Sequence, residues 1–156
     1  MAGDEASNLR GRGGSHLEIV HSIPNPDEYN MPYAPAIRVH SGKTVYVAGV
    51  TAAPVYHHHP HIASEFDAIP EDPAEQARMT MENLRDTLRA AGGDLEHVVQ
   101  MFRFIPNIQQ NQDAINRVMG EYMGKHRATT TTVEVSRLAT DPRLKLEIAA
   151  VAVVPD

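Results

Sequence analysis

Apolar and polar positions along the chain repeat with two periods, which predict both strands and helices. Short segments rich in apolar and β-branched residues predict strands at residues 16–21, 36–40, 43–50, 97–105, 129–137 and 144–154. Apolar residues at helical spacing predict one helix between Asp72 and Gly92 and another over residues 109–123. The Ser41-Gly42 pair between two strands predicts a β-hairpin. This order of elements indicates a single α+β domain.

The first helix has the clearest boundary signals. Asp72 can serve as the N-cap, Pro73 suits the first helical position, and Glu75 provides the acid of a capping box. Gly92 is well placed to end the helix. Its apolar side is made mainly of small or flexible side chains, which suits packing against a sheet.

The last predicted strand is apolar on both of its faces. Its even positions are Leu144, Leu146, Ile148, Ala150, Ala152 and Val154, and its odd positions are Lys145, Glu147, Ala149, Val151 and Val153. An antiparallel sheet with one solvated face does not require this pattern. Since two helices can cover only one face, we expect a second subunit on the other. A sheet that curls on itself is the alternative.

Composition restricts the class of protein. The 156 residues suit one domain, and no apolar run approaches the roughly 18 residues of a membrane span. Residues 1–15 are polar and glycine-rich, which predicts a disordered tail before a domain at 16–156. Cysteine is absent, which excludes thiolate catalysis and disulfides. With no signal peptide evident, a cytoplasmic location is expected.

The charge pattern argues against a polyanionic partner. The formal net charge is −6, and the basic residues are scattered among acids. We therefore expect neither nucleic acid nor a membrane as a partner. Because glycine-rich phosphate-binding loops and nucleophile elbows are also missing from the sequence, no cofactor is expected.

Two groups of residues are candidates for chemistry. Glu147 lies inside the doubly apolar strand, where a carboxylate is either a general acid or base or one half of a structural ion pair. His57, His59 and His61 lie in a long loop over residues 51–70. They are weak candidates for metal ligands, and a flexible loop is the favoured explanation. A third interpretation is that the loop lines a pocket and offers one imidazole to a ligand.

Several segments together resemble the Rid (YjgF) family of reactive intermediate deaminases. They are residues 33–49, 75–93, 114–122, 133–138 and 146–154. The resemblance implies a chorismate-mutase-like fold, with a mixed sheet carrying two helices on one face. It further implies a homotrimer in which the other sheet face forms a central barrel, and a ligand cleft at each subunit interface. Active relatives hydrolyse small imines or enamines to keto acids and ammonia.

The resemblance also suggests which residues form the site. Tyr33, Gly49 and Asn116 match substrate-binding positions, and Glu147 matches a glutamate that positions or activates water. Thr130, followed by Thr131, stands where the family has an arginine that binds the substrate carboxylate.

A hydroxyl cannot reproduce the bidentate contact of a guanidinium. Arg127, three residues earlier, is a candidate substitute. The sequence thus predicts a divergent hydrolase or deaminase of a small reactive metabolite. A non-catalytic trimer that binds or senses a small molecule is the alternative.

Overall fold

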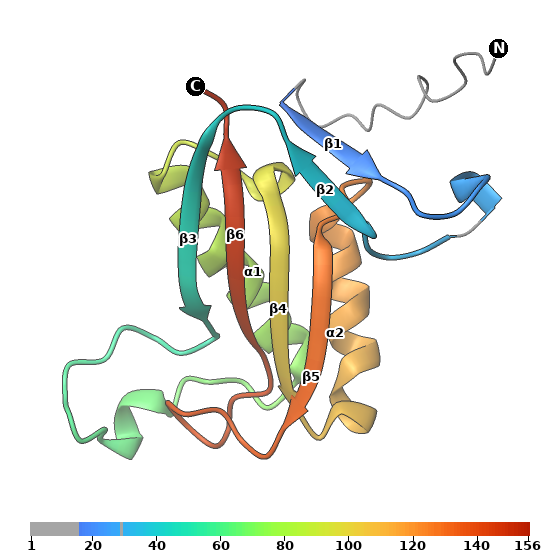
Figure 1. Ribbon diagram of the computed structural model, residues 1–156. Coiled ribbons are helices and arrows are strands. Elements are labelled where there is room, and N and C mark those ends of the chain that lie inside the picture. Colours follow the sequence, from blue (N-terminus) through green and yellow to red (C-terminus); the bar gives the residue numbers. More distant parts are fainter. Residues whose placement is uncertain (1–15, 29) are drawn as a thin grey trace, which may run out of the picture.

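The computed structural model describes residues 16–28 and 30–156. The predicted disordered tail at residues 1–15 lies outside the described residues. Within them, four strands form a mixed sheet in the order β3, β6, β4 and β5 (Figure 1). These strands span Lys43–Val50 (β3), Glu147–Val154 (β6), Val98–Pro106 (β4) and Thr129–Val135 (β5).

Strand β6 is central and antiparallel to both of its neighbours. Strands β4 and β5 are parallel because helix α2 (Ile108–Met123) returns the chain to the starting end of the sheet between them. Helix α1 (Pro73–Ala90) connects β3 to β4 through a short 3₁₀ turn at Leu95–His97. Two further 3₁₀ turns occupy Pro26–Glu28 and Ala63–Phe66. The α+β fold with a mixed sheet is therefore confirmed.

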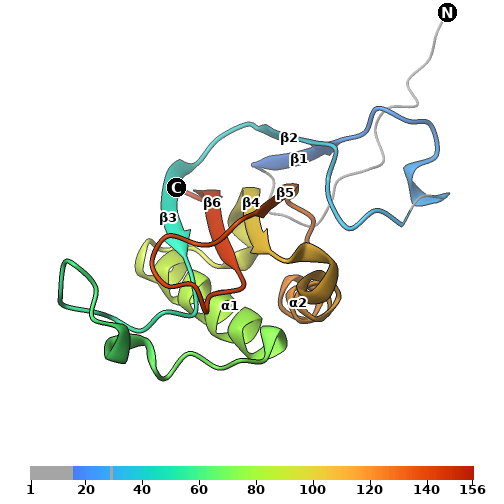
Figure 2. The same cartoon turned by 90° about the horizontal axis from the view of Figure 1, so that it is seen from below.

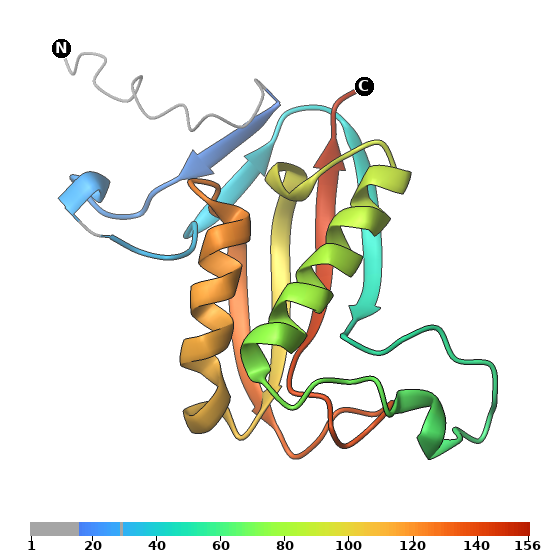
Figure 3. The same ribbon diagram turned by 180° about the vertical axis from the view of Figure 1, so that it is seen from behind.

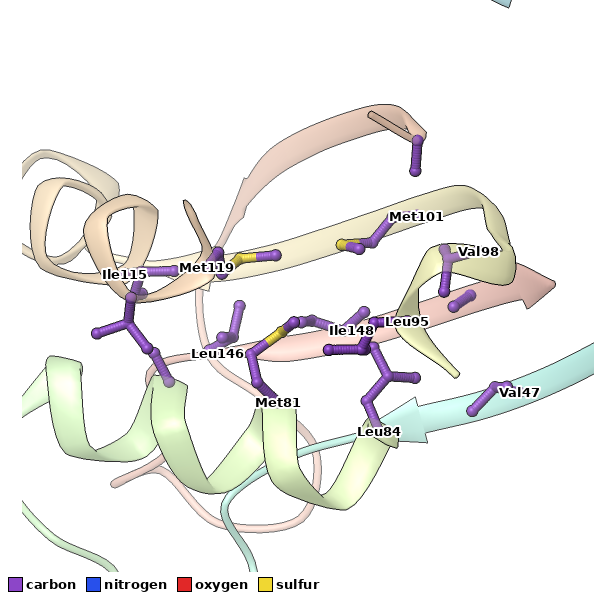
Figure 4. Close-up of a cluster of buried hydrophobic side chains, with 14 of the residues drawn as sticks. Val47, Met81, Leu84, Leu95, Val98, Met101, Ile115, Met119, Leu146 and Ile148 are labelled. Carbon is purple, nitrogen blue, oxygen red and sulfur yellow. The ribbon is translucent and has the colours of Figure 1, made fainter. Parts of the chain in front are cut away.

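Helices α1 and α2 lie side by side on one face of the sheet (Figures 2 and 3). The side chain of Asp72 accepts a hydrogen bond of 3.0 Å from the amide of Ala74, so the predicted N-cap forms. The core fills the space between these helices and the sheet (Figure 4). Met81 and Leu84 of α1, Ile115 of α2 and Ile148 of β6 are fully buried there.

The predicted hairpin at Ser41-Gly42 is wrong. Strand β2 (Ala36–Val39) pairs with β1 (Leu17–Val20) in a separate two-stranded sheet, and β3 pairs with β6. A two-residue hairpin turn needs a positive φ at its first central residue. Of the pair, only Gly42 has one, at 110°. The chain therefore passes from one sheet into the other (Figure 1).

A buried amide determines how the chain enters β6. Gln76, fully buried in α1, donates hydrogen bonds to the carbonyls of Pro70 and Arg143 and accepts one from the amide of Lys145. These bonds of 2.8–2.9 Å satisfy backbone groups that have no strand partner. The predicted strand at 144–154 therefore begins only at Glu147.

The sheet face opposite the helices carries exposed apolar side chains. Tyr46 of β3 is 82% exposed, and Phe102 of β4 and Val133 of β5 are 37% and 41% exposed. Beside them lie the odd-numbered residues of β6, whose even-numbered residues Ile148, Ala150 and Ala152 are buried under the helices. We call this surface, built from Tyr46, Phe102, Val133, Ala149 and Val151, the open face.

The long loop after β3 is anchored by a small second core. Phe66 is fully buried and packs with Ala52, Ile69, Leu138 and Leu144. Arg143 bonds the carboxylates of Asp67 and the buried Asp141, and the adjacent guanidinium lowers the pKa of Asp141.

In the described part of the chain, neither α1 nor α2 combines the length and hydropathy that a membrane crossing requires.

Replacing a core leucine tests the packing of α1. We expect Leu84→Ala to lower the free energy of unfolding by about 2–5 kcal/mol, because it removes fully buried methyl groups and leaves a cavity. Met79, 37% exposed on the same helix, is the matched control, and Met79→Ala should change it by less than about 0.5 kcal/mol. Denaturant unfolding at one fixed protein concentration measures both. Equal effects would contradict this packing.

Candidate functional site

A pocket of about 480 Å³ lies where α2 faces β4 and β5. This volume is within the range of small-molecule sites. Its polar lining comes from α2, from both parallel strands and from two loops, and its apolar lining consists mainly of methionines. The lining includes Tyr33, Met101, Arg103, Asn116, Met119, Gly120, Met123, His126, Arg127, Thr130 and Thr132.

Four of the predicted substrate-binding residues line this pocket. Tyr33 contributes from the loop before β2, Asn116 from α2, Arg127 from the loop before β5, and Thr130 from β5 itself. Thr131 is not part of the lining, because alternation along β5 turns it to the other face of the sheet, opposite Phe102. The pocket therefore brings together only part of the predicted set.

Arg103 is a pocket residue that the sequence reasoning missed. Its Nε donates to Oγ1 of Thr132 at 2.8 Å, and its Nη1 donates to Oδ1 of Asn116 at 2.7 Å. The same Nη1 lies 3.4 Å from the sulfur of Met119. Burial lowers the pKa of this guanidinium, which nevertheless stays charged. The sequence did contain a signal for this residue, since Arg103 is the only charged residue in β4.

Arg127 lines the pocket, but its guanidinium bonds the backbone. Its Nη1 donates to the carbonyls of Gly124 and His126 at 2.8 and 3.0 Å, and its Nε donates to the carbonyl of Met31. These contacts satisfy carbonyls at the end of α2, as basic side chains commonly do. The geometry gives Arg127 a structural role beside the pocket.

The half-buried His126 adds a neutral imidazole to the pocket wall. Its Nε2 lies 2.7 Å from the carbonyl of Val98 and must donate, since a carbonyl can only accept. Burial lowers the pKa of His126, against the smaller opposing effect of this hydrogen bond. Near neutral pH the ring is therefore uncharged and Nδ1 is an acceptor.

Glu147 and Gly49 lie together, but away from this pocket. A Cβ atom placed on Gly49 would be 2.1 Å from Oε1 of Glu147, so the carboxylate rests directly against the glycine backbone. Gly49 falls where the pairing of β3 with β6 shifts register, between Val47 and Val50. Such irregularities commonly redirect a side chain beside a functional site.

The predicted site is divided between the two faces of one sheet. Glu147 is paired with Phe104 and occupies an odd position of β6, on the side of the open face. Arg103 and Thr132, which are directly paired, are on the helix side of the sheet with the pocket. A single chain therefore does not place Glu147 beside the pocket.

The histidines of the long loop gather around an aromatic side chain. The rings of His59 and His61 are 5.4 and 4.7 Å from that of Tyr56, and Nδ1 of His61 lies 3.0 Å from the carbonyl of Thr140. The backbone amide of His57 donates to Glu65. Over residues 16–28 and 30–156, these side chains form no group of three or more that could hold a metal ion.

The contact between Gly49 and Glu147 can be tested directly. We expect Gly49→Ala to move the Glu147 carboxylate by at least about 1 Å, because non-bonded heavy atoms need about 3.5 Å and a flexible side chain yields before backbone does. A crystal structure of the variant measures the shift. Gly120→Ala is the control, since its added Cβ would meet no atom within 4 Å. A carboxylate that stays in place would contradict the contact.

Comparison with known proteins agrees with this geometry. A crystal structure of the Rid-family protein YyfB from Yersinia pestis superposes with a TM-score of 0.67 at 23% identity, covering 89% of this chain and 99% of that one. The crystal structure of Escherichia coli TdcF with bound serine gives a TM-score of 0.58 at 28% identity, covering 80% and 89%.

Sequence comparison identifies relatives of similar length. Protein DfrA of Myxococcus xanthus is 32% identical over 137 residues, which is 87% of this chain and 95% of that protein. The putative reactive intermediate deaminase TdcF of Escherichia coli is 38% identical over 88 residues, or 54% of this chain and 66% of TdcF. The sequence model described as Endoribonuclease L-PSP matches residues 26–154. The chain therefore belongs to the Endoribonuclease L-PSP family, which is the Rid (YjgF) family.

Proposed function

We propose that this protein hydrolyses the C=N bond of a small imine, or of the imine tautomer of a small enamine, in a cleft between subunits of a homotrimer. The observation that carries the proposal is the division of the site. Tyr33, Asn116 and Thr130 line a pocket on one side of the sheet, and Glu147 rests against Gly49 on the other. A second copy of the chain is the simplest source of the missing carboxylate for each pocket.

The open face supports this assembly. Tyr46, Phe102 and Val133 expose apolar surface there, and contiguous exposed apolar surface commonly marks an interface. If the open faces of three subunits meet around an axis, Glu147, which lies on that side of the sheet, is carried to the boundary with a neighbour. The neighbour's pocket, at the sheet edge formed by β5, is then the partner half of the site.

The chemistry needs one group that moves protons and several that bind. Glu147 accepts a proton from water as the oxygen attacks the imine carbon, and the π electrons of C=N move to nitrogen. Glu147 returns this proton to the nitrogen, which gives the neutral carbinolamine. It then accepts the hydroxyl proton of the carbinolamine and passes it to the nitrogen as the C–N bond breaks, so that a carbonyl group forms and ammonia leaves. Asn116 and Tyr33 offer hydrogen bonds to polar groups of the substrate.

The relatives support a small, amino-acid-derived substrate. TdcF is described as a reactive intermediate deaminase, and its crystal structure contains serine. The net charge of −6 and the dispersed basic residues do not favour RNA, in spite of the name of the family. A trimer that binds a small molecule without reacting is the second candidate, because the family arginine is replaced by Thr130.

Removal of the carboxylate charge distinguishes these functions. We expect Glu147→Gln to lower turnover by about 10²- to 10⁴-fold, because the amide cannot accept the proton of water. Ammonia release from freshly generated imines of small amino acids measures the rate. Glu75→Gln, on the exposed side of α1, is the matched control and should retain full activity. No ammonia release by the unmodified protein, with ligand binding retained, would favour the non-catalytic trimer.

Mixing two inactive variants tests whether each site is shared. Glu147→Gln keeps the pocket, while Gly120→Leu fills it from α2 and keeps the carboxylate. We expect the separate variants to be inactive trimers by light scattering. Unfolded and refolded together in equal amounts, they should recover about a quarter of the sites, because half of the pockets and half of the carboxylates are intact. A monomer, or no recovery in mixed trimers, would overturn the shared site.

A further inference from the structure

Arg103 differs from the arginines that form ion pairs in this fold, and from Arg127 and Arg137, whose hydrogen bonds go to backbone carbonyls. Arg38, Arg85, Arg89 and Arg143 each lie within 4 Å of a carboxylate. Arg103 is half-buried, and over the described residues it is part of no ion pair. Its recorded partners are a hydroxyl, an amide oxygen and a thioether, all of them neutral. A partly buried charge with only neutral partners is costly unless a counter-ion approaches it.

These neutral partners hold the guanidinium plane while leaving donors for a ligand. Thr132 accepts from Nε and Asn116 accepts from Nη1, so two different elements orient the group. Within the described part of the chain, Nη2 donates to no protein atom. The second Nη1 proton meets only the sulfur of Met119, which is a weak acceptor that a stronger one can replace.

We infer that Arg103 of β4 is the residue that binds the substrate carboxylate in this protein, in place of an arginine at position 130. The inference rests on the proposed function and names the residue that recognises the charge of its substrate. In the parallel register Thr130 is opposite Met101, and Arg103 is opposite Thr132. Arg103 therefore enters the pocket from β4, the strand that pairs with the strand of Thr130. It lies two register positions beyond Thr130, on the same face of the sheet.

The apolar lining of the pocket indicates what kind of side chain the substrate carries. Met101, Met119 and Met123 supply flexible apolar side chains to the lining. Methionine adapts to irregular shapes, so these walls suit a small aliphatic side chain rather than a charged one. A carboxylate at Arg103 and a short apolar group among the methionines leave the C=N carbon near Asn116 and Thr130.

The test compares a carboxylate with its neutral amide. Pyruvate and pyruvamide have similar shapes and differ in charge, and neither needs turnover to bind. The unmodified protein should bind pyruvate more tightly than pyruvamide, and Arg103→Met should weaken pyruvate binding by about 10- to 100-fold, as expected when a charged hydrogen-bond partner is removed. Arg103→Lys should be intermediate, because an ammonium keeps the charge without the planar donors. Nuclear magnetic resonance titration measures the affinities.

Arg117→Gln is the matched control for charge. Arg117 is exposed on α2 and does not line the pocket, so its replacement changes the net charge equally and should alter pyruvate affinity less than about twofold. Thermal unfolding supplies a second readout. Because no acidic residue at 16–28 or 30–156 pairs with Arg103, Arg103→Met should not lower the melting temperature, whereas replacement of an arginine held in a structural ion pair would.

Two results would overturn the inference. One is equal affinity of the unmodified protein for pyruvate and pyruvamide, and the other is an unchanged preference for pyruvate in Arg103→Met. Failure of the proposed hydrolysis is detected separately, as absence of ammonia release. A protein that binds pyruvate through Arg103 without releasing ammonia from imines would keep this assignment and lose the proposed chemistry.

Discussion

The structure depends on a sheet whose central strand is apolar on both faces but carries helices on only one. Ile148, Ala150 and Ala152 are buried under α1 and α2, while Ala149 and Val151 lie on the open face with Tyr46 and Phe102. Burial of apolar surface is the main favourable term in folding and in association. The same strand that completes the core therefore also leaves apolar side chains on the open face, and it carries Glu147 at its first position.

Much of the fold could be predicted because local signals agreed with the final packing. The cap at Asp72 and the spacing of apolar residues in α1 are properties of neighbouring positions. The hairpin failed because strand pairing is not local. Ser41-Gly42 resembles a tight turn in sequence, but only Gly42 adopts a positive φ, and β2 pairs with β1 instead. The start of β6 was also missed, because Gln76 binds the segment before it from another element.

The candidate site could be predicted only in part, for a similar reason. Resemblance to a family assigns roles to matching positions, and it directed attention to Thr130 and its neighbour Arg127. A residue that supplies the same charge from another strand has no matching position. The pairing of Arg103 with Thr132 depends on the register of two parallel strands joined by α2, which the sequence does not reveal. The rule that selected Glu147, a charged side chain inside an apolar strand, would also have selected Arg103.

The place of β6 between β3 and β4 also has a consequence for synthesis of the protein. The nascent chain emerges with β3, α1, β4, α2 and β5 before β6, the strand that lies between β3 and β4 in the sheet, is made. Until then, β3 has no partner strand, since all its pairing is with the last segment of the chain. Long-range pairing of this kind delays folding and leaves apolar edges exposed. Residues up to Val154 must therefore leave the ribosome before the domain can close, a period in which chaperones would be of use.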